Sequence, residues 1–489
     1  MIGRQIRRVG LTLIAAFVAV FFQLNYIQIF AAERIASNDA NIRRLIAEYS
    51  IKRGDILTAD GKIIAVSKPT KGRLKFVRTY PFGDLYGHIT GYHSVFFGAD
   101  RIERSFNDQL LGEGGVISMQ DVEDRFLGSG EQGDDLVLTI HSELQRIARE
   151  ALGADRGAVV AMDPQTGEVR AMWSNPSFDP GPIASHDSKT ARAYWESLEP
   201  GSPTSPLLNV ATSRSFPPGS TMKVVTTAAA LREGFKADDT FPDPRELELP
   251  LSDETLTNFT KEPCTTGGEI DLFEALRVSC DTTFAMLGLE IPHTIFEIAE
   301  SMSFNAPMPF DIATGESVYP DVPADEAPLG AYAAIGQGDT AATPLQMAVV
   351  ASAIGNGGEV PRPRLVRDII DVDGSVVESF DYESLGEALS AEDARTITEM
   401  MVAVVESGTG TAARIEGIQV AGKTGTAQST KGASPHAWFI AFAPAADPQI
   451  AVAVFVENGG SFGSEATGGA VAAPIARRII EADKAIRGW

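Results

Sequence analysis

The sequence contains few cysteines, few histidines and no excess of basic charge. Its 489 residues include two Cys and six His, and 41 Lys and Arg stand against 65 Asp and Glu, a formal net charge of −24. The acidic balance argues against sequence-independent binding to nucleic acid, which needs a basic face. The sequence has no HExxH motif and no pair of CxxC motifs, so we predict neither a metal site nor a cofactor site.

Long apolar runs are also scarce, and the longest lies at the N-terminus. Residues 9–32 contain no charged residue, and about 20 apolar residues span a bilayer. Three arginines precede this stretch, a bias that keeps the N-terminus in the cytoplasm. We predict a cytoplasmic tail at 1–8, a single transmembrane anchor at 9–31 and an extracytoplasmic remainder. A cleaved signal peptide and a buried helix are the alternatives, although the apolar region is long for a signal peptide.

The two cysteines are close together in the sequence. Cys264 lies in a polar loop, KEPCTTGGE, and Cys280 follows 16 residues later. An oxidising exterior permits a disulfide. We therefore predict a Cys264–Cys280 bridge, which adds roughly 3 kcal/mol in the chain-entropy model. Two buried thiols are the alternative.

Residue patterns divide the rest of the chain into two parts. Short strand signals and few long apolar runs predict an elongated accessory module at 32–133. Within it, 53–67 reads as two strands joined by an Asp-Gly turn, and 97–115 reads as a polar helix closed by glycines. A glycine-rich linker at 128–135 leads into a larger domain at 134–489.

The larger domain mixes strands and helices. A hairpin at 157–174 turns at residues 164–167, and three consecutive strands near the C-terminus are flanked by helices. This order indicates an α+β fold, in which helices cover an antiparallel sheet. The other predicted elements are strands at 136–140, 418–428, 436–444 and 449–458 and helices at 142–152, 272–290, 343–358, 391–410 and 468–486.

A sharp turn followed by an apolar helix places a polar pair at one helix end. In SFPPGSTMKVVTTAAAL, Ser220 and Lys223 are three residues apart and share one helix face. The helix that follows is too apolar for the surface. A lysine in an apolar pocket loses its proton more readily, because burial disfavours the charged form. The pair fits a serine nucleophile with its base; an N-cap serine beside a solvated lysine is the alternative.

Two later segments carry chemistry that complements this pair. AGKTGTA places Lys423 inside an apolar strand as a second cation, and Gly425 lets another backbone come close. SCD places Ser279 and Asp281 at a helix end. Each motif alone is weak, since a strand-edge lysine beside a turn has the same pattern. The order SxxK, SxN-like and KTG is together a strong signature of penicillin-binding proteins and serine β-lactamases.

Beyond these motifs, the chain resembles the class B penicillin-binding proteins. RGDILTADGKIIA, RIERSFNDQLLG, GAVVAMDPQTGEVRAMWSNPSFDP and IGQGDTAATPLQMA are similar to successive parts of that family. The similarity covers nearly the whole chain after the apolar stretch and is greatest to the small actinobacterial type involved in cell division. It implies a mixed α/β dimerisation or pedestal module at 32–133 and a transpeptidase domain of the serine β-lactamase-like fold at 134–489.

The resemblance also implies a mechanism. Ser220 is expected to attack the carbonyl between two D-alanines of a peptidoglycan stem peptide, with Lys223 taking the serine proton. Ser279 is expected to relay a proton to the leaving D-alanine. The acyl-enzyme then passes to an amine of a neighbouring stem peptide, and β-lactams acylate the same serine. The implied partners are stem peptides, β-lactam antibiotics, the membrane and wall-synthesis or division proteins, including a separate glycosyltransferase.

The KTG segment is expected to bind the substrate. Lys423, Thr424 and Thr426, with Gly425 between the threonines, would hold the terminal carboxylate by charge-assisted hydrogen bonds. The backbone N–H groups of Ser220 and Thr426 would form an oxyanion hole.

The middle motif departs from the family, because Asp281 stands where asparagine is usual. An ionised Asp281 has no N–H donors for the substrate, and it favours the charged form of Lys223, which opposes the use of that lysine as a base. We predict weakened or altered catalysis, or a protonated Asp281; simple tolerance of the aspartate is the alternative. Val210 also replaces a frequent arginine, without an expected catalytic role.

The predicted function is therefore a membrane-anchored D,D-transpeptidase that cross-links peptidoglycan. A β-lactamase of the same fold is a rival that the long N-terminal module argues against. A catalytically weak sensor or scaffold that binds β-lactams or wall peptides is a second rival, which Asp281 makes conceivable. His436 is expected to be structural, and Trp438 and Phe439 are expected to serve the core.

Overall fold

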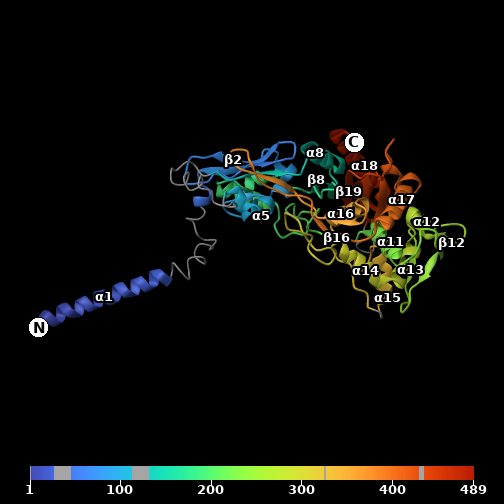
Figure 1. Cartoon of the computed structure of the whole chain (residues 1–489), viewed down its shortest axis with the longest axis horizontal. Helices are drawn as coiled ribbons and strands as arrows, with labels where there is room; N and C mark the ends of the chain where they lie inside the picture. The colour runs from blue at the N-terminus through green and yellow to red at the C-terminus, as the bar shows by residue number, and fades with distance from the viewer. Residues whose placement is uncertain (1, 27–45, 113–131, 324–325, 429–433) are drawn as a thin grey trace.

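The computed structural model describes residues 2–26, 46–112, 132–323, 326–428 and 434–489. Helix α1 (Ile2–Tyr26) is drawn apart from the other elements, which follow one another along the long axis of the molecule (Figure 1). Across the described residues, we find no helix with both the length and the apolar content needed to cross a membrane. The predicted anchor at 9–31 falls partly on α1 and partly on 27–31, outside the described residues.

A six-stranded sheet organises the module next to α1. Its order is β15-β14-β6-β1-β2-β3, with β6 parallel to β1 and the other pairs antiparallel. Strands β6, β14 and β15 come from beyond the predicted boundary at 133/134, so this sheet draws on both predicted parts of the chain. The strands are β1 (Ile56–Leu57), β2 (Ile63–Pro69), β3 (Phe76–Thr79), β6 (Asp135–Leu138), β14 (Val366–Ile370) and β15 (Val376–Ser379).

The predicted polar helix at 97–115 was wrong in length and in character. The structure has strand β5 (Gly98–Ala99) and two short helices, α5 (Arg101–Ser105) and α6 (Asn107–Leu110). Ile102 and Glu103 are completely buried. Each short helix buries only one turn. The buried carboxylate of Glu103, which pairs with Arg53 and Arg78, takes the place of the apolar stripe that a longer helix would show.

A five-stranded antiparallel sheet forms the centre of the larger domain. Its order is β17-β18-β19-β7-β8. Trp438 packs on one face and Phe439 on the other, as their alternation predicted. The strands are β17 (Ala421–Ala427), β18 (His436–Ala443), β19 (Ile450–Val456), β7 (Gly157–Met162) and β8 (Val169–Asn175).

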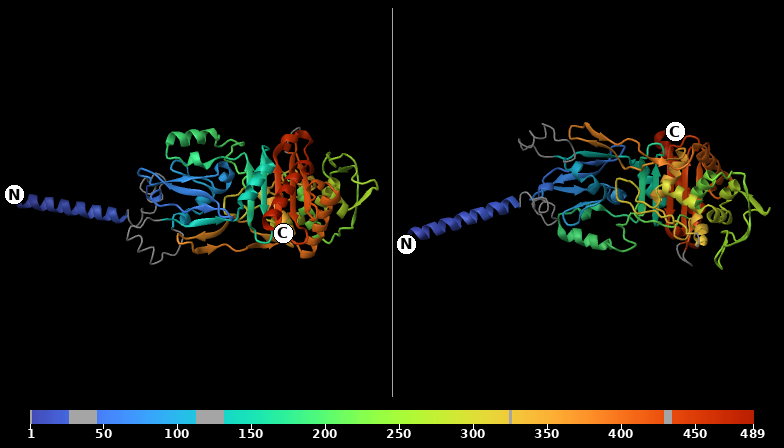
Figure 2. Two further views of the ribbon diagram at one scale, coloured as in Figure 1. Left: turned by 90° about the horizontal axis from the view of Figure 1, so that it is seen from above. Right: turned by 60° about the horizontal axis from the view of Figure 1, so that its bottom comes forward.

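Helices cover both faces of this sheet, which confirms the predicted α+β arrangement. Helix α16 (Pro344–Gly355) packs on the Trp438 face, and α8 (Ser142–Leu152) and α18 (Ala473–Arg487) pack on the opposite face. Figure 2 shows the same layering from two further directions. Apolar residues lie on all sides of α16, and nearly every residue of that helix is buried.

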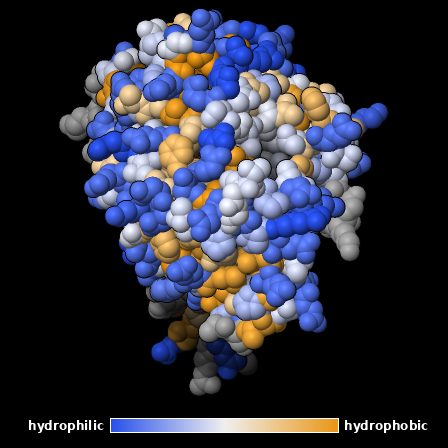
Figure 3. Space-filling model, turned by 90° about the vertical axis from the view of Figure 1, so that its right-hand side faces the viewer, coloured by the Kyte–Doolittle hydropathy of each residue, from blue (hydrophilic) through white to orange (hydrophobic). Residues whose placement is uncertain are grey.

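A group of helices extends from the sheet to the end of the molecule opposite α1 (Figure 1). Figure 3 views this end, where hydrophilic side chains cover much of the surface between smaller apolar patches. The helices of this group are α11 (Lys223–Arg232), α12 (Leu272–Val278), α13 (Asp281–Glu290), α14 (Pro292–Ser301), α15 (Ala327–Ala334) and α17 (Ala391–Ser407).

The single helix predicted at 272–290 is broken into α12 and α13. Ser279 ends α12 in the left-handed conformation, with φ 67°, and Cys280 starts the next helix. The apolar period continues through the break, so the pattern alone could not reveal it. The predicted disulfide between Cys264 and Cys280 is present at this point.

Shorter elements complete the fold. They are β4 (His93–Ser94), β9 (Thr240–Pro242), β10 (Glu246–Glu248), β11 (Thr255–Thr257), β12 (Glu269–Asp271), β13 (Glu359–Pro361), β16 (Ser384–Glu387), α4 (Gly87–Thr90), α9 (Pro180–Ile183), α10 (Ser188–Ser197), the 3-10 turns η2 (Gly83–Tyr86), η3 (Gly219–Met222), η4 (Thr411–Ala413) and η5 (Glu457–Glu465), and the π turn η6 (Gly468–Ala472).

Candidate active site

The predicted nucleophile lies on a turn packed against a sheet edge. Ser220 is in η3, directly before α11. Gly219 has φ +55°, and a Cβ added to it would lie 2.7 Å from the carbonyl oxygen of Thr426. The Gly219 N–H donates to the carbonyl of Gly336 at 2.9 Å. With no room for a side chain at Gly219, the turn approaches β17 closely enough to place Ser220 beside it.

The β17 side of this contact is equally close. A Cβ added to Gly425 would lie 2.7 Å from the carbonyl oxygen of Pro218. The Trp438 indole N–H donates to the carbonyl of Pro217 at 2.9 Å. The close backbone approach predicted at Gly425 is therefore present, and a buried indole holds the two prolines in front of the serine.

Lys223 is completely buried at the start of α11. Its ammonium donates to Asp281 Oδ1 at 2.7 Å and to the carbonyl of Ser279 at 2.8 Å, with a longer contact of 3.4 Å to Ser279 Oγ. Among the residues that the structure describes, no hydrogen bond joins Lys223 to Ser220. Burial lowers the pKa of Lys223, and the Asp281 carboxylate acts in the opposite direction.

Lys423 on β17 is also completely buried. Its ammonium donates to Ser279 Oγ at 2.8 Å and to the carbonyl of Thr424 at 3.0 Å. Burial and the nearby positive charge of Lys223 hold the pKa of Lys423 well below its ordinary value, with Asp281 opposing them. The second cation expected near the first is therefore in place.

Ser279 joins the three motifs in space. Its backbone is in the left-handed region, which is costly for a residue with a side chain. This conformation lets the hydroxyl accept from Lys423 while the carbonyl accepts from Lys223. The structure thus brings together Lys223, Ser279, Asp281 and Lys423, with Ser220 on the adjoining turn.

The remaining predicted binding residues lie along β17. Thr424 and Thr426 share one face of the strand, opposite the face of Lys423. The Thr424 hydroxyl shares a 2.6 Å hydrogen bond with Thr409, whereas the partly exposed Thr426 hydroxyl accepts a longer one, 3.4 Å, from the Gly468 N–H. Because β17 is an edge strand, an extended peptide could pair with its outer side.

Asn258 holds the middle motif and was missed from the sequence. Its Oδ1 accepts from the backbone N–H groups of Asp281 at 2.9 Å and Thr282 at 3.1 Å. The next residue, Phe259, donates its N–H to Asp281 Oδ2 at 3.2 Å. Cys280, the N-cap residue of α13, makes no capping hydrogen bond with its side chain, so Asn258 caps the helix from another loop.

No local sequence signal marks Asn258, because it precedes the motif by more than 20 residues. Cysteine spacing was the indirect clue, since the Cys264–Cys280 disulfide ties the Asn258 loop to α13. Asp243, Cys264 and Cys280 lie close enough to hold a metal ion, but both sulfurs are already joined in the disulfide.

His436 and Val210, both singled out in the sequence, pack within the fold. His436 Nδ1 accepts from the Asn458 N–H at 2.9 Å, and its ring packs against Phe216. Val210 is buried in the core cluster that includes Trp438.

Comparison with known proteins extends the similarity to the whole chain. Residues 157–481 match the penicillin binding protein transpeptidase domain, and residues 53–136 match the penicillin binding protein A dimerisation domain. The chain is 39% identical to the peptidoglycan D,D-transpeptidase PbpA of Mycolicibacterium smegmatis and 37% identical to PbpA of Mycobacterium tuberculosis, over 488 residues and 98% of each protein. Its fold matches a penicillin G acyl-enzyme complex of penicillin-binding protein A from M. tuberculosis, with a TM-score of 0.83 and 37% identity over 89% of this chain and 100% of that one.

Proposed function

The chain belongs to the penicillin-binding protein transpeptidase family, and we propose that Ser220 is its acyl-enzyme nucleophile. The protein is a serine-type peptidoglycan D,D-transpeptidase that acts in cell wall synthesis and is acylated by β-lactams. One observation carries the residue assignment: Ser279 contacts two buried lysines directly beside the Ser220 turn. Burying two amines around one hydroxyl costs stability but favours proton transfer, so the arrangement is typical of a functional site.

The proposed reaction has two acyl transfers. Ser220 Oγ attacks the carbonyl carbon of the D-alanyl-D-alanine bond, and Lys223, in its neutral form, takes the hydroxyl proton. The C–N bond breaks, the Ser279 hydroxyl passes its proton to the departing D-alanine nitrogen, and Lys223 returns the proton it holds to Ser279 and becomes neutral again. An amine of a second stem peptide then attacks the ester, loses a proton to the lysine and restores Ser220, which receives its proton back.

The proposed substrate position is along the outer edge of β17. Lys423 and the Thr426 hydroxyl would hold the terminal carboxylate, with Thr424 held by Thr409 as support. The backbone N–H groups of Ser220 and Thr426 would stabilise the oxyanion, each by about 3 kcal/mol of barrier. The close packing at Gly219 and Gly425 supports this arrangement, because it leaves these two backbone segments in contact.

A weak sensor remains the second candidate, and the Lys223–Asp281 ion pair favours it. A carboxylate at 2.7 Å stabilises the ammonium form, which cannot accept the serine proton. Such a protein would still bind β-lactams and wall peptides but would turn over peptide slowly.

We place the catalytic domain outside the cytoplasmic membrane, with the N-terminus inside. Seven large apolar side chains of α1 are 47–78% exposed, and lipid would cover them: Leu11, Leu13, Ile14, Phe17, Val18, Val20 and Phe21. A transpeptidase needs glycan strands that a glycosyltransferase has made, so a separate enzyme of that class and division proteins are the expected partners. Protease treatment of intact and opened cells tests the topology, and digestion of the domain only in opened cells would contradict it.

Intact-mass measurement tests the enzyme assignment. Penicillin G should add one drug mass to the protein, and Ser220→Ala should abolish that addition. Ser215→Ala is the matched control, since Ser215 is exposed five residues earlier. Turnover of a D-alanyl-D-alanine peptide by the wild type then separates enzyme from sensor. Acylation that persists in Ser220→Ala would refute the assignment of the nucleophile.

A further inference from the structure

One hairpin of the first sheet has only basic charged residues, although the chain as a whole is acidic. From Ile63 to Thr79, strands β2 and β3 and their turn contain five basic residues and no acidic one, while the whole chain has a net charge of −24. One of the five, Arg78, is buried. The other four are exposed around the turn: Lys68, Lys71, Arg73 and Lys75. We call this turn and its four cations the basic tip.

Within the part of the chain that the structure describes, the cations of the basic tip have no acidic partners. Among the described residues, no salt bridge or side-chain hydrogen bond involves any of the four, whereas arginines elsewhere pair with carboxylates, such as Arg146 with Glu143 and Arg362 with Glu383. In a chain with a large surplus of acids, four adjacent unpaired cations form a distinct field of opposite sign.

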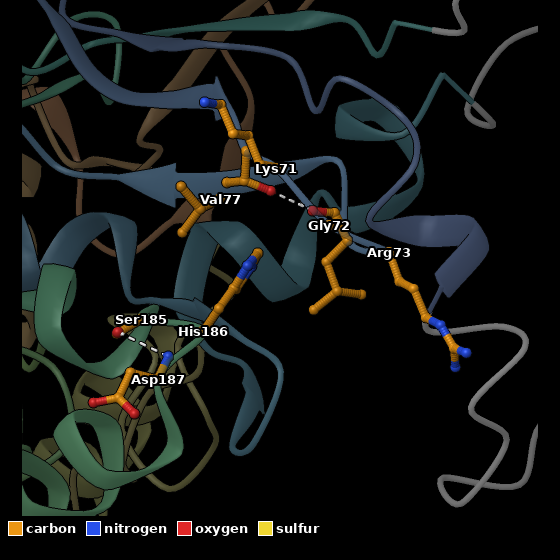
Figure 4. A pocket seen from close by; sticks show the side chains of 9 residues that line it. Lys71, Gly72, Arg73, Val77, Ser185, His186 and Asp187 are labelled. Carbon is orange, nitrogen blue, oxygen red and sulfur yellow. Dashed lines mark hydrogen bonds between the residues drawn. The ribbon is translucent and has the colours of Figure 1, made fainter.

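The geometry fits a broad anionic surface better than one small anion. Figure 4 shows Lys71 and Arg73 projecting from the turn in different directions, so their charges do not converge on a point. The groove beneath the turn, of about 500 Å³, is lined on its other side by Ser185, His186 and Asp187. The exposed Asp187 carboxylate would repel an anion bound there.

The basic tip is firmly held at the end of the module that the chain enters from α1. The N–H groups of Lys75 and Phe76 both donate to the carbonyl of Tyr49, at 3.0 and 3.2 Å. The Thr70 N–H donates to the carbonyl of Lys75 at 2.7 Å and closes the turn. Strand β2 lies on the α1 side of the molecule, away from α12 and α13 (Figures 1 and 2).

We propose that the basic tip binds the anionic phospholipid headgroups of the membrane that holds α1, and thereby orients the module on the bilayer. The inference rests on the proposed membrane attachment for the orientation of the molecule. Each cation near an anionic membrane surface contributes attraction equivalent to about fivefold in binding, and salt screens it. Four cations on one rigid turn therefore suffice to bias how the tethered module leans.

The test measures how often the tip meets the bilayer. The full chain is placed in nanodiscs of phosphatidylglycerol or phosphatidylcholine with a spin label at Gly72→Cys, where an added Cβ meets no atom within 4 Å. A label at Glu290→Cys, exposed at the end of α13, is the distant control. We expect relaxation of the tip label by a lipid-bound paramagnet to be several-fold stronger in phosphatidylglycerol, and the control label to respond equally weakly in both lipids.

Charge removal identifies the cause. Lys71→Gln/Arg73→Gln/Lys75→Gln should abolish the difference between the two lipids. Salt on the order of 0.5 M should abolish it too, because it screens the attraction between exposed charges. The matched control, Lys236→Gln/Arg395→Gln/Arg478→Gln, removes three exposed cations from the larger domain and should keep it. Penicillin acylation should be unchanged in both triple variants. Equal relaxation in the two lipids, or persistence of the difference without the three cations, overturns the proposal.

Two further outcomes distinguish a free polyanion from a membrane and test the attachment by α1. If soluble polyphosphate without a bilayer protects the tip label while phosphatidylglycerol does not, the surface serves a free polyanion and the membrane proposal is wrong. If the chain does not stay in nanodiscs, the proposed attachment by α1 fails separately. In that case, sedimentation with phosphatidylglycerol vesicles is measured for the wild type and for the triple variant of the basic tip. Salt-sensitive sedimentation of the wild type alone would support the proposal, and equal sedimentation of the two proteins would overturn it.

Discussion

Two buried clusters in this molecule have the same charge composition and opposite chemical character. In the N-terminal module, Glu103 lies between Arg53 and Arg78; in the larger domain, Asp281 lies with Lys223 and Lys423. Each cluster has two cations and one carboxylate. All four cations and Glu103 are buried, while the Asp281 side chain is 17% exposed. The difference lies in the cations, because arginine stays charged in proteins while lysine gives up its proton when buried.

In the arginine cluster, both carboxylate oxygens of Glu103 accept hydrogen bonds from an arginine. Arg53 Nε and Arg78 Nε each donate to one oxygen of Glu103 at 2.6 Å. Arg78 also donates to the carbonyl of Gly54 at 2.7 Å, and Arg53 to Asn107 at 2.8 Å. Burial alone would raise the pKa of Glu103, but the two arginines lower it to about 2. The cluster is therefore a fixed structural joint between the RGD and RIERSFN segments.

The lysine cluster is poised instead of fixed. Burial is the largest effect on both lysines and lowers both pKa values, and the Asp281 carboxylate only partly compensates. A hydroxyl, Ser279 Oγ, lies between the two amines, whereas in the other cluster each arginine donates directly to one carboxylate oxygen. Proton transfer is possible here and excluded in the arginine cluster.

Exchanging the cation types gives the largest expected effect. Lys223→Arg should reduce the rate of penicillin acylation by about 10³-fold, since a guanidinium cannot act as a base and general base catalysis contributes 10²–10⁴. Arg78→Lys, the reverse exchange, should lower stability but leave the acylation rate of the folded protein unchanged. Stopped-flow acylation and thermal unfolding measure the two effects. An active Lys223→Arg protein would remove the distinction between the clusters.

Removing the shared carboxylate of the arginine cluster gives the next largest effect. Glu103→Gln leaves two buried arginines without their counter-charge and should cost about 3–5 kcal/mol of unfolding free energy. Because the pKa of Glu103 in the fold, about 2, is below its unfolded value, its contribution is complete above about pH 4.3 and is lost as pH falls toward 2.

Denaturant unfolding between pH 2 and 7 measures this contribution. The wild type should lose about 3 kcal/mol over the acid range, and the Glu103→Gln protein should lack that part of the pH dependence. Glu143→Gln, which removes an exposed carboxylate paired with Arg146, is the control and should change stability by less than about 1 kcal/mol. A comparable loss in both variants would show that burial of the Glu103 cluster has no special effect.

Local patterns predicted the lysine cluster well and the arginine cluster poorly. Ser220 and Lys423 were found because each lies in a short motif whose neighbours, two prolines or an apolar strand, report its environment. The arginine cluster joins Arg53 to Glu103, 50 positions apart, and local patterns do not indicate such pairs, although both segments carry the family resemblance. A charged residue is normally expected on the surface, and the sequence does not show that Glu103 is buried. The segment 97–115 was therefore predicted to be a polar helix.

Long-range pairing was beyond the reach of the sequence. Strand β14 pairs with β6 across more than 220 residues, and nothing in either strand specifies the partner, because both show only a short apolar pattern. The break at Ser279 was hidden for a related reason. Its left-handed backbone is maintained by contacts from Lys423 and from the Asn258 loop, neither of which is near it in the sequence.

Removing the carboxylate of the lysine cluster should have a moderate effect in the opposite direction. In Asp281→Asn nothing opposes the burial of Lys223, so its pKa falls further and more of it is neutral at pH 7. We expect faster acylation at neutral pH, by about tenfold for each unit by which the pKa of Lys223 falls, and a rate that rises with pH at lower values than in the wild type. Asp271→Asn, which retains the cap of α12, is the charge-matched control. An unchanged pH–rate profile would show that Asp281 does not control the base.

The smallest effect should come from loosening the lysine cluster without changing its charges. Asn258→Ala removes the acceptor for the Asp281 and Thr282 N–H groups, a loss comparable to a helix cap, about 1 kcal/mol of stability. Because the same loop sets the direction of the Asp281 carboxylate, acylation should also slow severalfold. Ser390→Ala removes a true N-cap from α17 and should cost similar stability with no change in acylation. Equal acylation rates in the two variants would mean that Asn258 supports only the fold. A slower rate confined to Asn258→Ala would mean that the reactivity of the two lysines depends on how accurately the loop positions the Asp281 carboxylate. In the arginine cluster the cations themselves hold both oxygens of Glu103, whereas one oxygen of Asp281 depends on the backbone of this loop.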